Sequence, residues 1–247
     1  MKVVEINKKI INKYFHKGAL GWTIFAFAGA LAALVIGYVY SVHIANKIDQ
    51  QDRSEFLTHV QTIALLTNAS DVASLAGNES DLTSPAYQRI KSMLYNLHNI
   101  NSGARFVYYM RGDSDNRKLI FLADSESPGS KDYSPPGGVY NDTSPLEMKN
   151  YINATPFVEG PYTDEWGTWV SAYAPVWWQG RLVGIFGMDV TANKWEASDH
   201  RFKYGIFAIS CLAVLWYVLL GAYIRRTILC TQQIRDAEKL FPPENIK

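Results

Sequence analysis

The chain has 247 residues, 48% of them hydrophobic, and a formal net charge of +1. This length can hold one sizeable domain with additional segments, and a charge near zero gives no electrostatic reason to expect nucleic acid as a partner. The two cysteines, Cys211 and Cys230, lie in or just after an apolar run, which excludes a disulfide framework in the central region. The five scattered histidines show no metal-site spacing, so neither a metal nor a cofactor is expected.

Two uncharged segments have the length and composition of membrane-spanning helices. Residues 18–42 contain no charged side chain, and neither do residues 204–224. The first follows a segment, 1–17, with five lysines and one acid, and the second ends on two arginines. By the positive-inside rule, residues 1–17 and the tail or linker helix 225–247 are expected in the cytoplasm. Residues 43–203 are then extracytoplasmic, and the lipid bilayer of the cell (inner) membrane is one expected partner.

The first span carries a stripe of small residues at a spacing of four. Gly29, Ala33 and Gly37 would lie on one side of a helix, where small side chains allow a second helix to approach closely. A homodimer paired along this stripe is therefore one interpretation. Chance is the competing one, because the whole span is rich in Ala and Gly.

The outer region begins with helices. Apolar residues keep helical spacing from Ile44 to about Asn68, which predicts an amphipathic continuation of the first span. A short helix is expected over Ser70–Ala76. Ser84 and Pro85 then predict the N-cap and first position of another helix, with a core face made of Tyr87, Ile90, Leu94 and Leu97.

Strands follow the helices. Ala104–Arg111 and Lys118–Ser125 predict a hairpin. The segment Glu126–Asn141 is rich in Pro, Gly and Ser and is expected to be irregular, as a lid or binding loop. Ser144 and Glu147 form a capping box that opens a short helix to about Tyr151.

The last hairpin organises the prediction. Thr168–Trp178 and Arg181–Val190 are strand-like, and only Gln179-Gly180 separates them. Alternation separates Trp169, Ser171 and Tyr173 from Val170, Ala172 and Ala174 in the first strand. In the second strand it separates Ile185, Gly187 and Asp189 from Phe186, Met188 and Val190. A carboxylate that ends an apolar strand needs a partner, which is either a bound ligand or a protein donor. The expected fold class is α+β: an antiparallel sheet with a long helix on one face and a loop-built pocket on the other.

The chain resembles Cache domains, the PAS-like extracellular sensor modules of bacterial membrane-bound signalling receptors. The resemblance lies in FVYYMR (106–111), LIFLADSE (119–126) and above all YTDEWGTWVSAYAPVWWQGRLVGIFGMDVTA (162–192), and it spans about residues 44–195. It implies a pocket for a small molecule such as an amino acid or carboxylate. By similarity, the candidate lining is Tyr109, Arg111, Asp124, Trp169, Ser171, Tyr173 and Asp189.

Each candidate also has a structural interpretation. Arg111 could hold a ligand carboxylate or be solvated at its strand end. Tyr109 and Tyr173 could be core aromatics, Trp169 could serve packing alone, and Asp124 could cap a turn.

The function expected from these features is ligand sensing, with a conformational signal passed across the membrane to a cytoplasmic output domain or protein. The chain could be the input half of a longer kinase, cyclase or chemoreceptor, or a stand-alone sensor. A structural membrane protein without a ligand is one alternative. A carboxylate-based hydrolase is another, but the sequence has no common catalytic motif and no histidine from Asn99 to Asp199, so no enzyme activity is expected.

Overall fold

The computed structural model describes residues 2–101, 103–113, 115 and 117–240. They fall into two compact units, Met1–Asn46 with Arg201–Lys247, and Lys47–His200. The expected helix break at Pro242-Pro243 lies outside the described residues.

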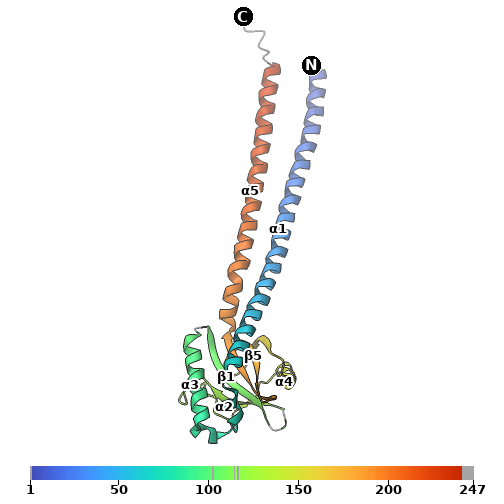
Figure 1. Ribbon diagram of the computed structural model, residues 1–247. Helices are drawn as coiled ribbons and strands as arrows, with labels where there is room; N and C mark the ends of the chain where they lie inside the picture. Colours follow the sequence, from blue (N-terminus) through green and yellow to red (C-terminus); the bar gives the residue numbers. More distant parts are fainter. Residues whose placement is uncertain (1, 102, 114, 116, 241–247) are drawn as a thin grey trace. The chain divides into compact units, whose positions relative to one another are not determined.

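The first unit is a pair of helices that run side by side (Figure 1). It contains the first part of α1 (Lys2–Leu66) and most of α5 (Ala192–Leu240). A Cβ atom added at Gly29 would lie 3.3 Å from the Tyr217 hydroxyl, and one added at Gly37 would lie 2.1 Å from the Ser210 Oγ. Gly29 and Gly37 therefore pack on the second helix of the same chain, whereas Ala33 between them is exposed. A homodimer paired along this stripe stays a prediction.

Two helical segments are long and apolar enough to cross a membrane. They lie within Phe27–Leu66 and Phe207–Asp236, where an 18-residue stretch of each has a mean hydropathy of 1.8 and 2.1. Both overlap the predicted spans 18–42 and 204–224. The exact membrane boundaries remain a prediction.

The helices of the second unit follow the sequence signals closely. α1 ends at Leu66, and α2 (Ala69–Ser74) and the 3-10 helix η1 (Glu79–Thr83) lead to α3 (Pro85–Ile100). The Ser84 hydroxyl accepts a hydrogen bond from the Tyr87 amide at 3.0 Å, which confirms the predicted N-cap. Three of the four predicted core residues of α3 are buried, and Leu97 packs partly against them.

The sheet has six antiparallel strands rather than the four that two hairpins provide. Its order is β3-β2-β1-β6-β5-β4. The strands are β1 (Ala104–Gly112), β2 (Leu119–Asp124), β3 (Val139–Tyr140), β4 (Phe157–Thr163), β5 (Thr168–Trp178) and β6 (Arg181–Thr191). The expectation that Glu126–Asn141 holds no regular element is wrong at its end, because Val139 pairs with Ile120 and Tyr140 with Leu119. The two central strands, β1 and β6, come from different hairpins.

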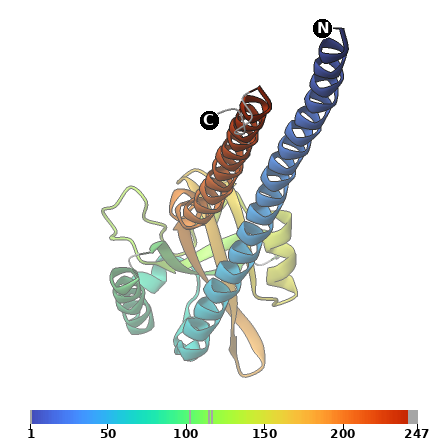
Figure 2. The ribbon, with the colours of Figure 1, turned by 90° about the horizontal axis from the view of Figure 1, so that it is seen from above.

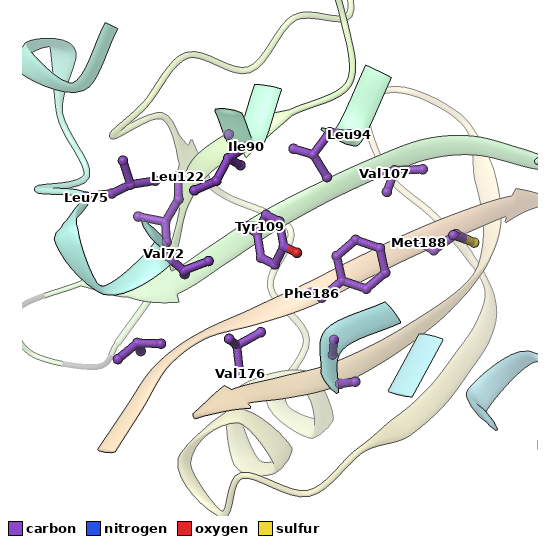
Figure 3. Close-up of a cluster of buried hydrophobic side chains, with 14 of the residues drawn as sticks. Val72, Leu75, Ile90, Leu94, Val107, Tyr109, Leu122, Val176, Phe186 and Met188 are labelled. Atoms are coloured by element: carbon purple, nitrogen blue, oxygen red, sulfur yellow. The ribbon is translucent and has the colours of Figure 1, made fainter. Parts of the chain in front are cut away.

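The two faces of the sheet have different covers. On one face, Tyr109, Phe186 and Met188 pack with residues of α1, α2 and α3 in the larger core (Figure 3). On the other face, a smaller cluster includes Tyr108 and Tyr173 and contacts α4 (Pro145–Ile152). α3 and α4 lie on opposite sides of the sheet (Figure 2). The α+β prediction with a long helix on one face is therefore confirmed.

The β5–β6 turn and its two faces also match the prediction. Gln179 and Gly180 have φ values of 48° and 74°, so both turn residues adopt the left-handed conformation that this tight link requires. Ser171 pairs with Asp189 and Ala172 with Met188, which keeps the polar and apolar sets on separate faces.

Candidate functional site

A cavity lies on the sheet face opposite α3, between the strands and the loops that cover them. It is a small, half-open hollow: the volume available to the centre of a water molecule is about 30 Å³, within about 400 Å³ of space between atoms that includes open solvent. Its walls are aromatic and acidic. They comprise Phe106, Tyr108, Met110, Phe121, Asp124, Asp132, Ser134, Tyr140, Tyr162, Asp164, Trp166 and Asp189.

Asp189 is the buried acid of this cavity. It is 5% exposed, and its Oδ1 accepts a hydrogen bond from the Tyr108 hydroxyl at 2.8 Å. Gly187 makes this contact possible, because a Cβ atom there would lie 2.3 Å from the Tyr108 ring. Burial raises the pKa of Asp189 to about 7, although the hydroxyl groups of Ser171 and Tyr108 act in the opposite direction. Asp189 is therefore a carboxyl group held by neutral partners.

Hydroxyl groups connect the strands around Asp189. The Tyr162 hydroxyl lies 2.9 Å from the Ser171 Oγ and 3.1 Å from the Tyr173 hydroxyl. The Tyr108 hydroxyl lies a further 3.4 Å from that of Tyr173. Three tyrosines from β1, β4 and β5 thus form a connected network beside one carboxyl group. Such a network fixes the rings that line the cavity.

The turn between β4 and β5 supplies one aromatic wall. The Asp164 Oδ1 accepts hydrogen bonds from the amides of Trp166 and Gly167 and from the Trp169 Nε1, at 2.8–3.0 Å. These bonds hold the Trp166 ring near Tyr140, with ring centroids 6.2 Å apart. Asp164 therefore organises this turn, and three N–H groups of the turn and of Trp169 stabilise its carboxylate.

A second buried acid, Glu147, comes from α4. It is 2% exposed and belongs to the capping box with Ser144, as predicted. Its Oε1 has no hydrogen-bond partner among the described residues. Burial raises the pKa of Glu147 to about 8, and the nearby charges of Glu159 and Asp189 add to the effect. The face of the sheet toward α4 therefore buries two carboxyl groups, Asp189 and Glu147, and burial disfavours the ionised form of both.

The loop after β2 is fastened over the other end of the cavity by two cations. The Lys91 Nζ lies 2.6 Å from the Asp124 Oδ1 and also donates to the Glu126 carbonyl. Arg105 forms ion pairs of 2.5 Å with both Glu126 and Asp132. The Asp124 Oδ2 accepts a hydrogen bond from the Ser134 amide at 2.7 Å. Burial raises the pKa of Asp124, whereas Lys91 lowers it.

Five of the seven predicted lining residues lie on the cavity side of the sheet. Asp124 and Asp189 line the cavity directly. Ser171 and Tyr173 belong to the hydroxyl network, and the Trp169 ring contacts Phe106 edge to face with centroids 5.1 Å apart. Asp124 also fastens a loop, which is close to the structural role that the sequence left open for it.

Tyr109 and Arg111 are not brought to the cavity. Tyr109 is fully buried in the core on the α3 side, where its hydroxyl lies 2.5 Å from the Thr67 Oγ1 (Figure 3). The Arg111 guanidinium donates to the Leu75 carbonyl at 3.0 Å. The reason is register: Tyr108 pairs with Gly187 and Tyr109 with Phe186, so odd-numbered residues of β1 face the helices.

The sequence reasoning missed several residues of the site: Phe106, Tyr108, Tyr140, Glu147, Tyr162 and Trp166. Tyr108 could have been found by asking which neighbouring tyrosine shares a face with Asp189. That answer needs the β1–β6 register, which no local pattern provides. Glu147 was identified only as a capping residue.

No protein-family model matches this chain, and no curated protein matches it significantly. Solved structures do match. The chain is similar in structure to extracellular sensory domains. The ligand-binding domain of the Campylobacter jejuni chemoreceptor Tlp3, solved with 4-methylisoleucine, is 16% identical, with 67% of this chain and 62% of that chain covered and a TM-score of 0.41. The extracellular domain of the putative histidine kinase mmHK1S-Z2 is 18% identical, with 65% and 61% covered and a TM-score of 0.43.

An extracellular ligand-binding receptor from Desulfohalobium retbaense is 13% identical, with 64% of this chain and 26% of that chain covered and a TM-score of 0.43. In each of these three cases the match spans less than two thirds of the other chain.

Proposed function

We propose that this chain is a membrane-anchored sensor whose region 43–203 lies outside the cytoplasm and binds a small molecule in the cavity. The observation that carries the proposal is the buried Asp189 carboxyl group in a cavity wall, with hydroxyl groups as its partners. A buried acid without a cationic partner costs stability. A ligand that compensates this cost would bind selectively at this place, and perturbed carboxyl groups in a cavity are typical of functional sites.

The apolar helices support the membrane part of the proposal. In α1, Phe27 and Ile36 are 76% and 68% exposed, and in α5 Ile209 and Leu212 are 67% and 65% exposed. A continuous apolar surface of this kind is unfavourable in water and suits a hydrocarbon environment. We place the bilayer of the cell membrane around both helices, with 1–17 and 225–247 in the cytoplasm.

A route for the signal starts at the cavity. Asp189 lies near the end of β6, and α5 begins at Ala192, directly after that strand. The Trp195 Nε1 then donates to the Asp49 Oδ1 of α1 at 2.8 Å, and its ring packs on Phe56. A shift of β6 therefore acts on both chain segments that lead into the helix pair. The partners of such a sensor are a second copy of the chain and a cytoplasmic output domain or protein, and no catalysis is assigned to the chain itself.

The test is a ligand screen by thermal shift on the full chain in detergent micelles, with Asp189→Asn beside the wild type. The expected result is stabilisation of the wild type by a subset of small metabolites and loss of that stabilisation in the variant. Stabilisation that persists in Asp189→Asn would place the ligand elsewhere. A screen without a single stabilising compound would favour a structural membrane protein.

A further inference from the structure

We infer that the ligand of this cavity is an organic ammonium ion that carries an apolar alkyl or aryl group, and that a carboxylate group on the ligand is not needed for binding. The inference deepens the proposed sensor function and rests on it. It separates this cavity from one built for a zwitterion, because a zwitterion also needs donors for its carboxylate, and cations are the strongest of these.

The charges of the wall point to a cation. Asp124, Asp132, Asp164 and Asp189 line the cavity, and none of its described lining residues is Lys, Arg or His. Lys91 and Arg105, which are not among the lining residues, form ion pairs with Asp124 and Asp132. Each of the two cations is already engaged by carboxylates, with Arg105 held by two of them. A ligand carboxylate would have to break one of these pairs to find a cation.

The four acids differ in how they are satisfied. Asp124 and Asp132 have cationic partners, and Asp164 accepts three NH hydrogen bonds. Asp189 alone relies on hydroxyl groups, and a carboxylate has about four acceptor positions in total. It therefore retains capacity for an ammonium donor at a position that faces the cavity.

The remaining walls suit the body of a cation. Phe106, Tyr108, Phe121, Tyr140, Tyr162 and Trp166 line the cavity. Aromatic faces attract ammonium groups through the ring quadrupole, most strongly where water is excluded. The same rings accept an alkyl or aryl chain by apolar contact.

Glu147 adds a second buried carboxyl group near this wall, and it becomes negative only as the pH rises through its raised pKa of about 8. It is buried with one unpartnered oxygen, and its charge interacts unfavourably with that of Asp189. An ammonium ion near Asp189 lowers the cost of keeping both groups charged, whereas an anionic ligand raises it. The geometry and the charges thus select the same class of ligand.

The experiment compares three compounds with one carbon skeleton: 2-phenylethylamine, phenylalanine and 3-phenylpropanoate. A second set is 3-methylbutylamine, leucine and 4-methylpentanoate. Binding to the full chain in detergent micelles is measured by calorimetry, at a pH above the pKa of Asp189. We expect the amine of at least one set to bind about tenfold or more tighter than its amino acid, and the carboxylate not to bind. An amino acid that binds as tightly as its amine, or a carboxylate that binds best, would overturn the inference.

Two variants locate the effect. Asp189→Asn should abolish amine binding, since it removes the charge and keeps the shape. Asp71→Asn is the matched control, because Asp71 is an equally small acid that pairs with Arg89 at 2.6 Å, away from the cavity lining, and its loss should leave amine affinity unchanged. Equal losses in both variants would contradict the assignment.

If both amines fail while amino acids or carboxylates bind and depend on Asp189, the sensor function stands and the ligand class is wrong. If no compound of any class binds, both proposals fail.

Discussion

The Tyr108 hydroxyl reaches the Asp189 Oδ1 at 2.8 Å across the central strand pair of the sheet. The contact depends on pairing between β1 and β6, where Tyr108 stands opposite Gly187. The ring lies over the glycine because no side chain occupies that place. One tyrosine therefore shields the acid from water, donates to it and forms part of the cavity wall.

Gly187→Ala should separate the Tyr108 hydroxyl from the Asp189 carboxyl group. The new Cβ atom would lie 2.3 Å from the Tyr108 ring, which is too close for any relaxed packing. We expect a loss of about 1–3 kcal/mol in the free energy of unfolding, as is usual for overpacking, together with weaker ligand binding. Denaturant unfolding and calorimetry measure the two effects. Gly103→Ala is the control, because a Cβ atom there meets nothing within 4 Å; similar losses in both variants would show that the glycine contact is unimportant.

Stability should depend on pH through Glu147. Its pKa rises from 4.5 in the unfolded chain to about 8 in the folded protein, so its protonated form is the one that the fold favours. The stabilisation from proton binding is complete below about pH 4.5 and is lost as the pH rises toward 8, with a total on the order of 5 kcal/mol.

Glu147→Gln removes this titration. The unfolding free energy of the variant minus that of the wild type should therefore increase from about pH 5 to about pH 9. Asp189, with a raised pKa of about 7, contributes in the same direction in both proteins, so the difference between them reports chiefly on Glu147. The groups that face these two acids are Tyr108, Tyr140, Tyr162, Tyr173, Glu159 and Asp164. A difference that stays flat across this range would show that Glu147 is ionised normally.

The sequence predicted local structure well because its signals are local. Ser84-Pro85 and Ser144 with Glu147 start helices through hydrogen bonds within one turn, and Gly180 is required by the turn that it forms. The sequence could not predict which of Tyr108 and Tyr109 faces the cavity. Both faces of β1 are buried, so its alternation carries little contrast, and the choice depends on a partner strand some eighty residues away. The short strand β3 could not be predicted, because two residues are too few to show the alternation of apolar and polar side chains that marks a strand.

The loop Glu126–Ser134 should open when Lys91 is neutralised. Lys91→Met leaves the buried Asp124 without its cation, which typically costs about 3 kcal/mol or more. Hydrogen exchange at the Ser134 amide should accelerate, because that amide donates to the same carboxylate. The double variant Lys91→Met with Asp124→Asn removes both charges and should recover part of the stability. Unchanged exchange at Ser134 in the single variant would contradict the role of this ion pair as the loop fastening.

Membrane topology can be read by cysteine labelling. The chain is first freed of Cys211 and Cys230, and single cysteines are placed at Asn7 and at the exposed Lys131. A membrane-impermeant maleimide added to intact cells should label the second site and not the first, because the lysine-rich segment 1–17 is retained in the cytoplasm. Labelling at Asn7 from outside would reverse the proposed orientation.

The last prediction concerns transmission through Trp195. Its indole NH donates to Asp49, and its ring packs on Phe56 with centroids 5.8 Å apart, so the start of α5 is tied to the outer part of α1. A ligand shifts the signalling equilibrium only by its difference in affinity for the two states, and contacts such as these couple the cavity to the helices.

In a homodimer, single cysteines at Gln50 and Glu55 should therefore give a disulfide pattern that changes when a binding ligand is added. Trp195→Ala should abolish the change while ligand affinity stays close to that of the wild type. Trp195→Phe keeps the ring contact without the NH donor and should retain part of the response. A pattern that still responds fully in Trp195→Ala would assign transmission to another contact.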